Sequence, residues 1–349
     1  MAARSLALAR SHQRHGEPVT TVALVLGAGG AVGHAFHVGV LSALADEFGW
    51  DARAADLIVG TSAGSVVGAS LRVGLDPLDM RRRLFGQKLS PAGAVLTRRG
   101  EAAMAAVTAA TVPGSSAGRP RIASSQRVRR AVREPWKVTP GSLFSALAPP
   151  GRVPTDHLGA AYDDLLGDEW PDRPLWLPAV DLDIGHRVVF GREGAPPATL
   201  GQAVEASCAI PGYFSPVTID DSRYVDGAVQ STTNADLVAA FEPAPGLAVI
   251  SAPMSAVGRP LELGKLSMRP VAKRSLAREA KLLRDRDIEV ITFQPTPADL
   301  AVMAGGSNVG GGAGRPGGNA GAVCRQIVES TLNHVRTPAI ADRLSPLGP

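Results

Sequence analysis

The chain has 349 residues, 45% of them hydrophobic and 19% charged, and its formal net charge is +4 at pH 7. This composition is typical of a globular protein with a sizeable core and excludes a disordered chain, while the length allows one large domain or two of ordinary size. The two cysteines, Cys208 and Cys324, lie far apart, so neither a disulfide framework nor a zinc site is indicated.

The first 20 residues are polar and basic, and we expect a flexible N-terminal segment there. Arg4, Arg10 and Arg14 interrupt this stretch, whereas a signal peptide needs an unbroken apolar core. Nowhere does the chain reach the roughly 18 uncharged apolar residues of a membrane-spanning helix. We therefore expect a soluble, cytoplasmic protein whose contact with a membrane, where it occurs, is peripheral.

Two strand-to-helix units follow. Residues 22–26 are a short aliphatic run that ends at Gly27, and apolar spacing from residue 35 onward predicts a helix. Residues 56–59 repeat the strand pattern before Gly60, and residues 65–73 again have helical spacing. Successive units of this kind predict an α/β fold, in which helices cover both faces of a mainly parallel sheet.

The segment 88–154 loses clear periodicity and is rich in Pro, Gly, Ser and Arg, so we interpret it as an insertion that forms a mobile cap. The periodic patterns beyond it predict a hairpin over 175–182 and 187–190, a short helix over 200–207, buried strands over 247–251 and 288–293, and a basic helix over 270–286.

The segment 305–321 is dominated by glycine and predicts a flexible loop, followed by a last helix over 322–335. Taken together, these patterns predict a main domain over 21–240 and a C-terminal extension over 241–349 that completes it.

Residues 60–64, Gly60-Thr61-Ser62-Ala63-Gly64, fit G-x-S-x-G directly after a predicted strand and before a predicted helix. The flanking Gly60 and Gly64 permit a tight, strained turn that holds the serine hydroxyl clear of the sheet. There the helix dipole and the unpaired amides favour a developing negative charge. Ser62 is therefore a candidate nucleophile; the alternative is a packing turn with an ordinary capping serine.

A second glycine-rich turn, Gly27-Ala28-Gly29-Gly30-Ala31-Val32-Gly33, enters the first helix. Such a loop directs several backbone N–H groups to one point, as an oxyanion requires. We predict donors at Gly29, Gly30 and Ala31, with Gly27 and Gly33 supporting the turn. Dinucleotide binding competes, although G-x-G-x-x-G starting at Gly27 needs a glycine where Val32 stands. A purely structural turn is the third interpretation.

A third element is Tyr224-Val225-Asp226-Gly227-Ala228, and Ala206-Ser207-Cys208-Ala209-Ile210-Pro211 begins a segment ahead of it that continues to Val217. Alone, an Asp-Gly pair is more often a turn than a base. However, the order of a glycine-rich loop, G-x-S-x-G, A-S-x-A-x-P-x-x-F-x-P and D-G-A resembles the patatin-like phospholipase family. The resemblance covers about residues 22–237.

This resemblance implies a three-layer α/β/α fold and a Ser-Asp dyad that hydrolyses acyl esters of lipids or phospholipids. The family nucleophile falls on Ser62, and the proton-accepting aspartate falls on Asp226, followed by Gly227 and Ala228. The oxyanion loop falls on Gly29, Gly30 and their neighbours. In this scheme Asp226 accepts the Ser62 proton as Ser62 attacks the ester, so neither a histidine, a cofactor nor a metal is needed.

The glycine loop departs from the family pattern, which usually reads as three glycines, any residue, Arg or Lys, then glycine. Ala28 replaces the first glycine and Val32 replaces the basic residue. This departure leaves open a second hypothesis, a catalytically inert member of the family that binds lipid or a partner protein.

Histidines bear on a third hypothesis, an α/β-hydrolase esterase that uses Ser, Asp and His in that order along the chain. Only His334 follows Asp226, and it lies in the last predicted helix. His34 and His37 can share one helix face, but no third ligand is apparent, so we expect no metal site.

Basic residues cluster over 119–137 and 265–286. They suit an anionic membrane surface or simply a solvated face. The stretches contain few aromatic residues and no recognisable reading motif, so we expect no nucleic-acid partner.

Overall fold

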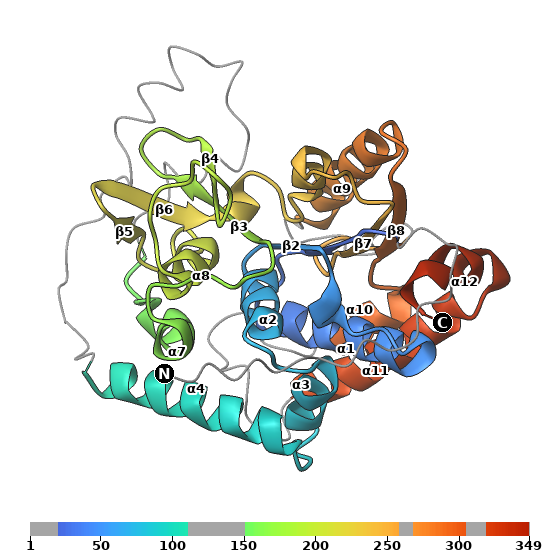
Figure 1. The fold of residues 1–349 in the computed structure, drawn as a ribbon, viewed down its shortest axis with the longest axis horizontal. Helices are drawn as coiled ribbons and strands as arrows, with labels where there is room; N and C mark the ends of the chain where they lie inside the picture. The colour runs from blue at the N-terminus through green and yellow to red at the C-terminus, as the bar shows by residue number, and fades with distance from the viewer. Residues whose placement is uncertain (1–19, 111–150, 258–267, 305–318, 349) are drawn as a thin grey trace, which may run out of the picture.

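The computed structural model describes residues 20–110, 151–257, 268–304 and 319–348 (Figure 1). Within these residues, eight strands form one mixed sheet with the order β5-β6-β3-β2-β1-β7-β8, and β4 pairs with β3. The strands are β1 (Val22–Leu26), β2 (Leu57–Gly60), β3 (Leu175–Asp181), β4 (Arg187–Phe190), β5 (Val217–Ile219), β6 (Ser222–Asp226), β7 (Leu247–Ser251) and β8 (Glu289–Phe293).

The sheet has a parallel part and an antiparallel part. The pairs among β3, β2, β1, β7 and β8 are parallel, whereas β4 and β6 run antiparallel to β3, and β5 runs antiparallel to β6. The carboxyl ends of β1 and β2 therefore meet at one edge, with Leu26 paired to Gly60. The loops that follow these two strands are the two glycine-rich turns.

Helices cover both faces of the sheet, which gives three layers (Figure 1). The α-helices are α1 (Gly30–Phe48), α2 (Ala63–Arg72), α3 (Pro77–Leu84), α4 (Pro91–Ala110), α7 (Asp156–Leu166), α8 (Leu200–Cys208), α9 (Arg269–Arg284), α10 (Pro297–Ala304), α11 (Asn319–Val335) and α12 (Pro338–Leu344). The 3-10 helices are η1 (Ala52–Ala54), η3 (Gly227–Val229), η4 (Ala235–Ala240) and η5 (Ser345–Leu347).

The alternation of side chains along β1 divides the core. Leu24 and Leu26 pack in the larger cluster with α1 and α11, whereas Ala23 and Val25 pack in the smaller cluster with α9 and η4. Both sets are fully buried, as expected for a central parallel strand. The predicted three-layer α/β/α fold is confirmed.

Two expectations need correction. The lack of periodicity over 88–154 predicts an irregular insertion, but residues 91–110 form α4, which packs against α7. Its alanine-rich sequence has a high intrinsic helix propensity without an apolar stripe.

Residues 111–150 lie outside the described part of the chain, as do residues 305–318 of the predicted glycine loop. Residues 319–321 belong to α11, and α12 follows it.

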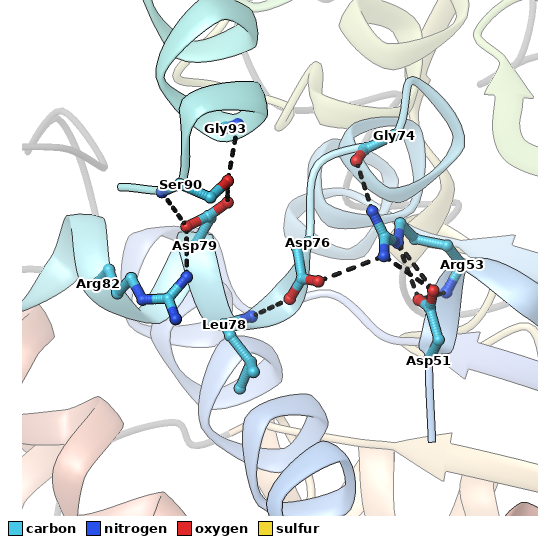
Figure 2. A network of polar contacts seen from close by, with 9 residues as sticks. All are labelled: Asp51, Arg53, Gly74, Asp76, Leu78, Asp79, Arg82, Ser90 and Gly93. Atoms are coloured by element: carbon cyan, nitrogen blue, oxygen red, sulfur yellow. Dashed lines mark hydrogen bonds and ion pairs between the residues drawn. The ribbon is translucent and has the colours of Figure 1, made fainter. Parts of the chain in front are cut away.

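A polar network joins η1, α3 and α4 near the end of the sheet where β2 begins (Figure 2). The Arg53 guanidinium binds Asp51 at 2.9 Å and Asp76 at 3.2 Å. Asp76 is the N-cap of α3. On the same helix, Asp79 accepts a hydrogen bond from the Ser90 amide at 2.9 Å, just before α4. These contacts fix α3 and α4 against the loop that precedes β2.

Candidate active site

Ser62 occupies the turn between β2 and α2 in a strained backbone conformation, with φ 53° and ψ −119°. Its side chain does not cap α2, so the hydroxyl is available for other contacts and the interpretation as a capping serine is not supported. A Cβ on Gly64 would lie 2.0 Å from the Leu26 carbonyl oxygen, and one on Gly60 would lie 2.6 Å from the Gly64 carbonyl oxygen. Sterics therefore require both glycines of the motif.

Hydrogen bonds from other segments hold this turn. The Ser62 amide donates to Ser207 Oγ at 3.1 Å, and the Ser207 hydroxyl donates to the Pro178 carbonyl at 2.9 Å. The Ser65 hydroxyl donates to the Ser62 carbonyl at 2.6 Å. α8 and β3 thus fix the backbone of Ser62 while its own hydroxyl takes no part in these bonds.

Asp226 ends β6 and is only 3% exposed. One of its oxygens accepts a hydrogen bond from the Ala228 amide at 2.8 Å. Burial raises the pKa of this carboxyl to about 6, and hydrogen bonds with Ala228 and the Ser62 side chain oppose the shift. Among the described residues, Asp226 has no ion pair that would offset the burial. The structure therefore brings Ser62 and Asp226 together.

The glycine-rich turn lies beside them. The Gly27 and Ala28 amides donate to the Ser251 and Thr232 carbonyls, at 2.9 and 2.7 Å. α1 then begins at Gly30, and no side chain caps its N-terminus. The first four amides of a helix lack intrahelical acceptors, so those of Gly29, Gly30, Ala31 and Val32 are free of intrahelical bonds, and the three predicted donors are among them.

Crowding explains the small residues in this turn. A Cβ on Gly29 would lie 2.6 Å from Gly33 Cα and 2.8 Å from Pro253 Cγ, while Gly30 has a φ of 59°. A Cβ on Gly33 would lie 3.7 Å from Ala63 Cβ. The two turns are therefore close neighbours, as an oxyanion site next to a nucleophile requires.

His37 supports the turn from within α1. Its Nε2 lies 2.7 Å from the Gly27 carbonyl, and its Nδ1 lies 2.7 Å from Ser251 Oγ. Burial lowers the pKa of His37 to about 3, so the ring is neutral, donates from Nε2 to the carbonyl and accepts the Ser251 hydroxyl at Nδ1. The sequence analysis considered His37 only as a metal ligand and expected no metal site there, whereas the structure gives it a contact that supports the turn.

A second buried carboxylate organises the loop after Asp226. Glu279 of α9 accepts hydrogen bonds from the Thr233 hydroxyl at 2.5 Å, from the Ala235 amide at 2.9 Å and from Ser231 Oγ. Within this loop, Asn234 Nδ2 donates to Thr61 Oγ1 at 3.1 Å and to the Gly227 carbonyl at 3.4 Å. Asn234 thus bridges the neighbours of Ser62 and Asp226.

The remaining sequence candidates lie elsewhere. His334 of α11 packs edge-on against Phe293 of β8, with ring centroids 5.9 Å apart. Two strands separate β8 from β2, which corresponds to roughly 14 Å at the usual strand spacing. The structure therefore does not bring His334 to Ser62. Among the described residues, no three His, Cys, Asp or Glu side chains are grouped to hold a metal.

Gly227 and the two cysteines are the last residues that the sequence analysis singled out. A Cβ on Gly227 would lie 2.3 Å from the Pro178 carbonyl oxygen, so this position also requires glycine. Cys208 and Cys324 are free and buried, and burial raises the pKa of each thiol to about 12. Both thiols are therefore poor nucleophiles.

In the described part of the chain, no helix is long and apolar enough to span a membrane.

This chain is similar to one protein family and to two solved structures. A family model described as patatin-like phospholipase matches residues 24–239. The chain is similar to VipD from Legionella pneumophila, with 14% identity and a TM-score of 0.42, over 90% of this chain and 66% of that one. It is also similar to the type III effector protein ExoU, with 15% identity and a TM-score of 0.32, over 93% and 54% of the two chains. The chain thus spans less than two thirds of each of these two proteins.

Proposed function

The chain belongs to the patatin-like phospholipase family, whose model matches more than half of it, and from this premise we propose that it is a serine hydrolase of lipid acyl esters, with Ser62 as nucleophile and Asp226 as proton acceptor. The observation that carries the proposal is that Ser62, on its strained turn, lies next to the buried Asp226 carboxylate, which has no cationic partner among the described residues. A pKa of about 6 leaves Asp226 ionised at neutral pH yet basic enough to accept a proton.

In the first half of the reaction, Asp226 accepts the Ser62 proton as Oγ attacks the ester carbonyl carbon. The carbonyl oxygen becomes an oxyanion, which amides of Gly29, Gly30 and Ala31 stabilise; one such donor typically contributes about 3 to 4 kcal/mol. The bond to the leaving alkoxide then breaks, and the alkoxide takes the proton from Asp226. An alcohol leaves, and the acyl group remains on Ser62.

In the second half, Asp226 accepts a proton from water while the water oxygen attacks the acyl-enzyme. The new oxyanion uses the same amides. When it collapses, the bond between Ser62 Oγ and the acyl carbon breaks, and Oγ regains a proton from Asp226. The products are a carboxylic acid and the free enzyme, and no cofactor enters this scheme.

The departures of the glycine loop bear on the inert alternative. The Ala28 amide already donates to the Thr232 carbonyl, and Ala28 and Val32 are both buried. Neither residue removes a donor from the proposed set at Gly29, Gly30 and Ala31. We therefore favour an active hydrolase, with a loop held by core packing where the family usually has a basic side chain.

The direct test is labelling of the purified protein with a fluorescent fluorophosphonate, followed by turnover of a short acyl ester. We expect labelling of the wild type and none of Ser62→Ala, whose turnover should fall at least about 10³-fold. Ser90→Ala is the matched control, because Ser90 also begins a helical segment but lies in the network of Figure 2.

The outcomes separate the hypotheses. Labelling of Ser62→Ala at the wild-type level would remove Ser62 as the nucleophile. A folded wild type that neither labels nor turns over the ester would favour the inert binder instead, and Val32→Arg would then be the substitution to try.

A further inference from the structure

Exposed apolar side chains gather at the N-terminal end of α9. Val257, Met268 and Val271 are each about half exposed, at 51%, 48% and 50%. Met268 and Val271 are neighbours at helical spacing. The Arg269 guanidinium donates to the Ser255 carbonyl at 2.8 Å, which brings the segment ending at Val257 to the same place. Met268 and Val271 thus form an exposed apolar pair, and the segment that ends at the exposed Val257 lies close to them.

Positive charge surrounds these apolar side chains. Residues 269–284 contain six Arg or Lys residues and a single acid, Glu279, which is buried beneath the helix. Arg274 and Arg278 are exposed and form no ion pair with other described residues. The outer face of this half of α9 is therefore cationic as well as apolar. We call Val257, Met268, Val271, Arg274 and Arg278 the docking surface.

The order of these residues along the helix matches the layers of a bilayer. The apolar pair comes first, Arg274 lies about 4.5 Å further along the axis, and Arg278 lies about 10 Å further. A headgroup layer is roughly 5 to 8 Å thick on each side of the hydrocarbon. A helix end that enters the acyl boundary would therefore place Arg274 among the phosphates and Arg278 at their outer edge.

The docking surface is close to the candidate dyad. Arg269 also donates to the Pro253 carbonyl at 2.9 Å, and the Pro253 ring packs against Gly29 of the proposed oxyanion loop. Further along α9, Glu279 binds the loop that joins Asp226 to Asn234. The helix that carries the docking surface is thus attached to both halves of the site.

We propose that the docking surface seats the protein on an anionic phospholipid bilayer and so presents the site to lipid. This inference rests on the proposed function, because a lipid hydrolase must reach substrate held in a membrane. Complementary charge argues for this occupant, since Lys and Arg side chains near an anionic bilayer are attracted to its surface and the apolar side chains add insertion.

The test measures vesicle binding with Ser62→Ala as the parent chain, so that binding does not depend on catalysis. Vesicles of phosphatidylcholine are compared with vesicles that also contain phosphatidylglycerol, at about 0.1 M salt, where the screening length is about 10 Å. Two variants are added to the parent: Arg274→Glu with Arg278→Glu, and Met268→Gln with Val271→Gln. The control is Arg284→Glu with Arg286→Glu, an equal charge change at the C-terminal end of α9 and in the turn just after it, about 15 Å from Arg274.

We expect the parent to bind anionic vesicles more tightly than neutral ones. The arginine variant should lose at least about tenfold on anionic vesicles, the apolar variant should lose about tenfold on both, and the control should retain binding. We expect every variant to fold, because the changed arginines are exposed and Met268 and Val271 are half exposed. Equal thermal midpoints for all chains would check this.

Three results would overturn the proposal: no vesicle binding by the parent, an equal loss in the control, or a concentration-dependent dimer that the same substitutions abolish, which would assign the surface to a second copy. Binding by the parent without any ester turnover by the wild type would instead sink the proposed function and leave the docking surface standing.

Discussion

Two aspartates in this molecule are almost inaccessible to solvent and have pKa values shifted in opposite directions. Asp79 of the network in Figure 2 is 2% exposed, and Asp226 of the candidate site is 3% exposed. Burial raises the pKa of both. At Asp79, hydrogen bonds from the Ser90 hydroxyl and amide and from Arg82 outweigh burial, so its pKa is lowered. At Asp226, the two hydrogen bonds with Ala228 and Ser62 do not outweigh it, and the pKa rises to about 6.

The difference teaches what distinguishes a structural carboxylate from a base. Arg82 lies 2.7 Å from Asp79, so the negative charge is both paired and fully bonded. Such a group holds α3 to α4 and has little tendency to take a proton. Asp226 has no cationic partner among the described residues, so its negative charge lowers the stability of the fold. Its pKa is raised for the same reason, and the carboxylate accepts a proton more readily.

The largest effect should come from neutralising each aspartate and measuring ester turnover. Asp226→Asn removes the proposed proton acceptor with almost no change of shape, so kcat should fall at least about 10³-fold. Asp79→Asn alters a carboxylate with similarly little solvent exposure and should leave kcat near the wild-type value, provided that the protein remains folded. Steady-state kinetics on a short acyl ester check both.

An equal loss of activity in the two variants would contradict the distinction between Asp226 as a base and Asp79 as a structural carboxylate. It would mean that loss of a buried charge anywhere in the fold disables the enzyme. The distinction also fails if Asp226→Asn keeps its activity. Circular dichroism and thermal midpoints separate loss of chemistry from loss of fold in either variant.

A next effect concerns the backbone at two glycines, Gly64 at the start of α2 and Gly49 at the end of α1. Gly64→Ala would drive a methyl group to 2.0 Å from the Leu26 carbonyl oxygen, so we expect a loss of about 3 kcal/mol or more in the free energy of unfolding. Gly49 is the matched control near the network. It has a φ of 65° and nothing within 4 Å of an added Cβ, so Gly49→Ala should cost only about 1 kcal/mol of backbone strain.

Chemical denaturation measures both glycine variants. Similar losses would show that the crowding at the nucleophile turn relaxes easily, and the strained geometry of Ser62 would then not depend on the close approach of Gly64 to β1.

Local patterns made part of the site predictable. The Gly60 to Gly64 turn follows a strand and precedes a helix, and both neighbours are adjacent in sequence, so its position needed no tertiary information. The same holds for the glycine loop before α1. The link from Ser62 to Asp226 came from the order of motifs in a known family, because the 163 intervening residues contain no spacing rule that would pair them.

Contacts made across the fold were not predictable in this way. The bond from Ser62 to Ser207 spans 145 residues, and that from Asn234 to Thr61 spans 173. Glu279 did leave a signal, because it lies in the buried stripe with Leu276, Ala280 and Leu283, where an apolar residue is expected. α4 was missed for the opposite reason, since its alanines favour a helix without marking one face.

The smallest of the three effects is on how the free energy of unfolding depends on pH. Its sign should differ between the two aspartates. Asp226 has a folded pKa of about 6 against an ordinary value of 3.8, so the native state binds its proton more readily than the unfolded chain. Stability from this group is therefore present below about pH 4 and is lost as pH rises to about 6. Asp226→Asn should then be more stable than wild type at pH 8, by about 2 to 3 kcal/mol, and nearly equal to it near pH 4.

Asp79 should show the reverse. Its lowered pKa means that its contribution is present above pH 3.8 and is lost as the pH falls below that value. Asp79→Asn should therefore be less stable than wild type at pH 8, by about 1 to 3 kcal/mol, because Ser90 and Arg82 lose a charged acceptor. Urea denaturation at pH 8 and pH 4 measures each difference against wild type, so the titration of His34 and His37 in the same range cancels. A destabilised Asp226→Asn at pH 8 would contradict the view that the charge of Asp226 is held at a cost, and with it the reason for treating this carboxylate as a base.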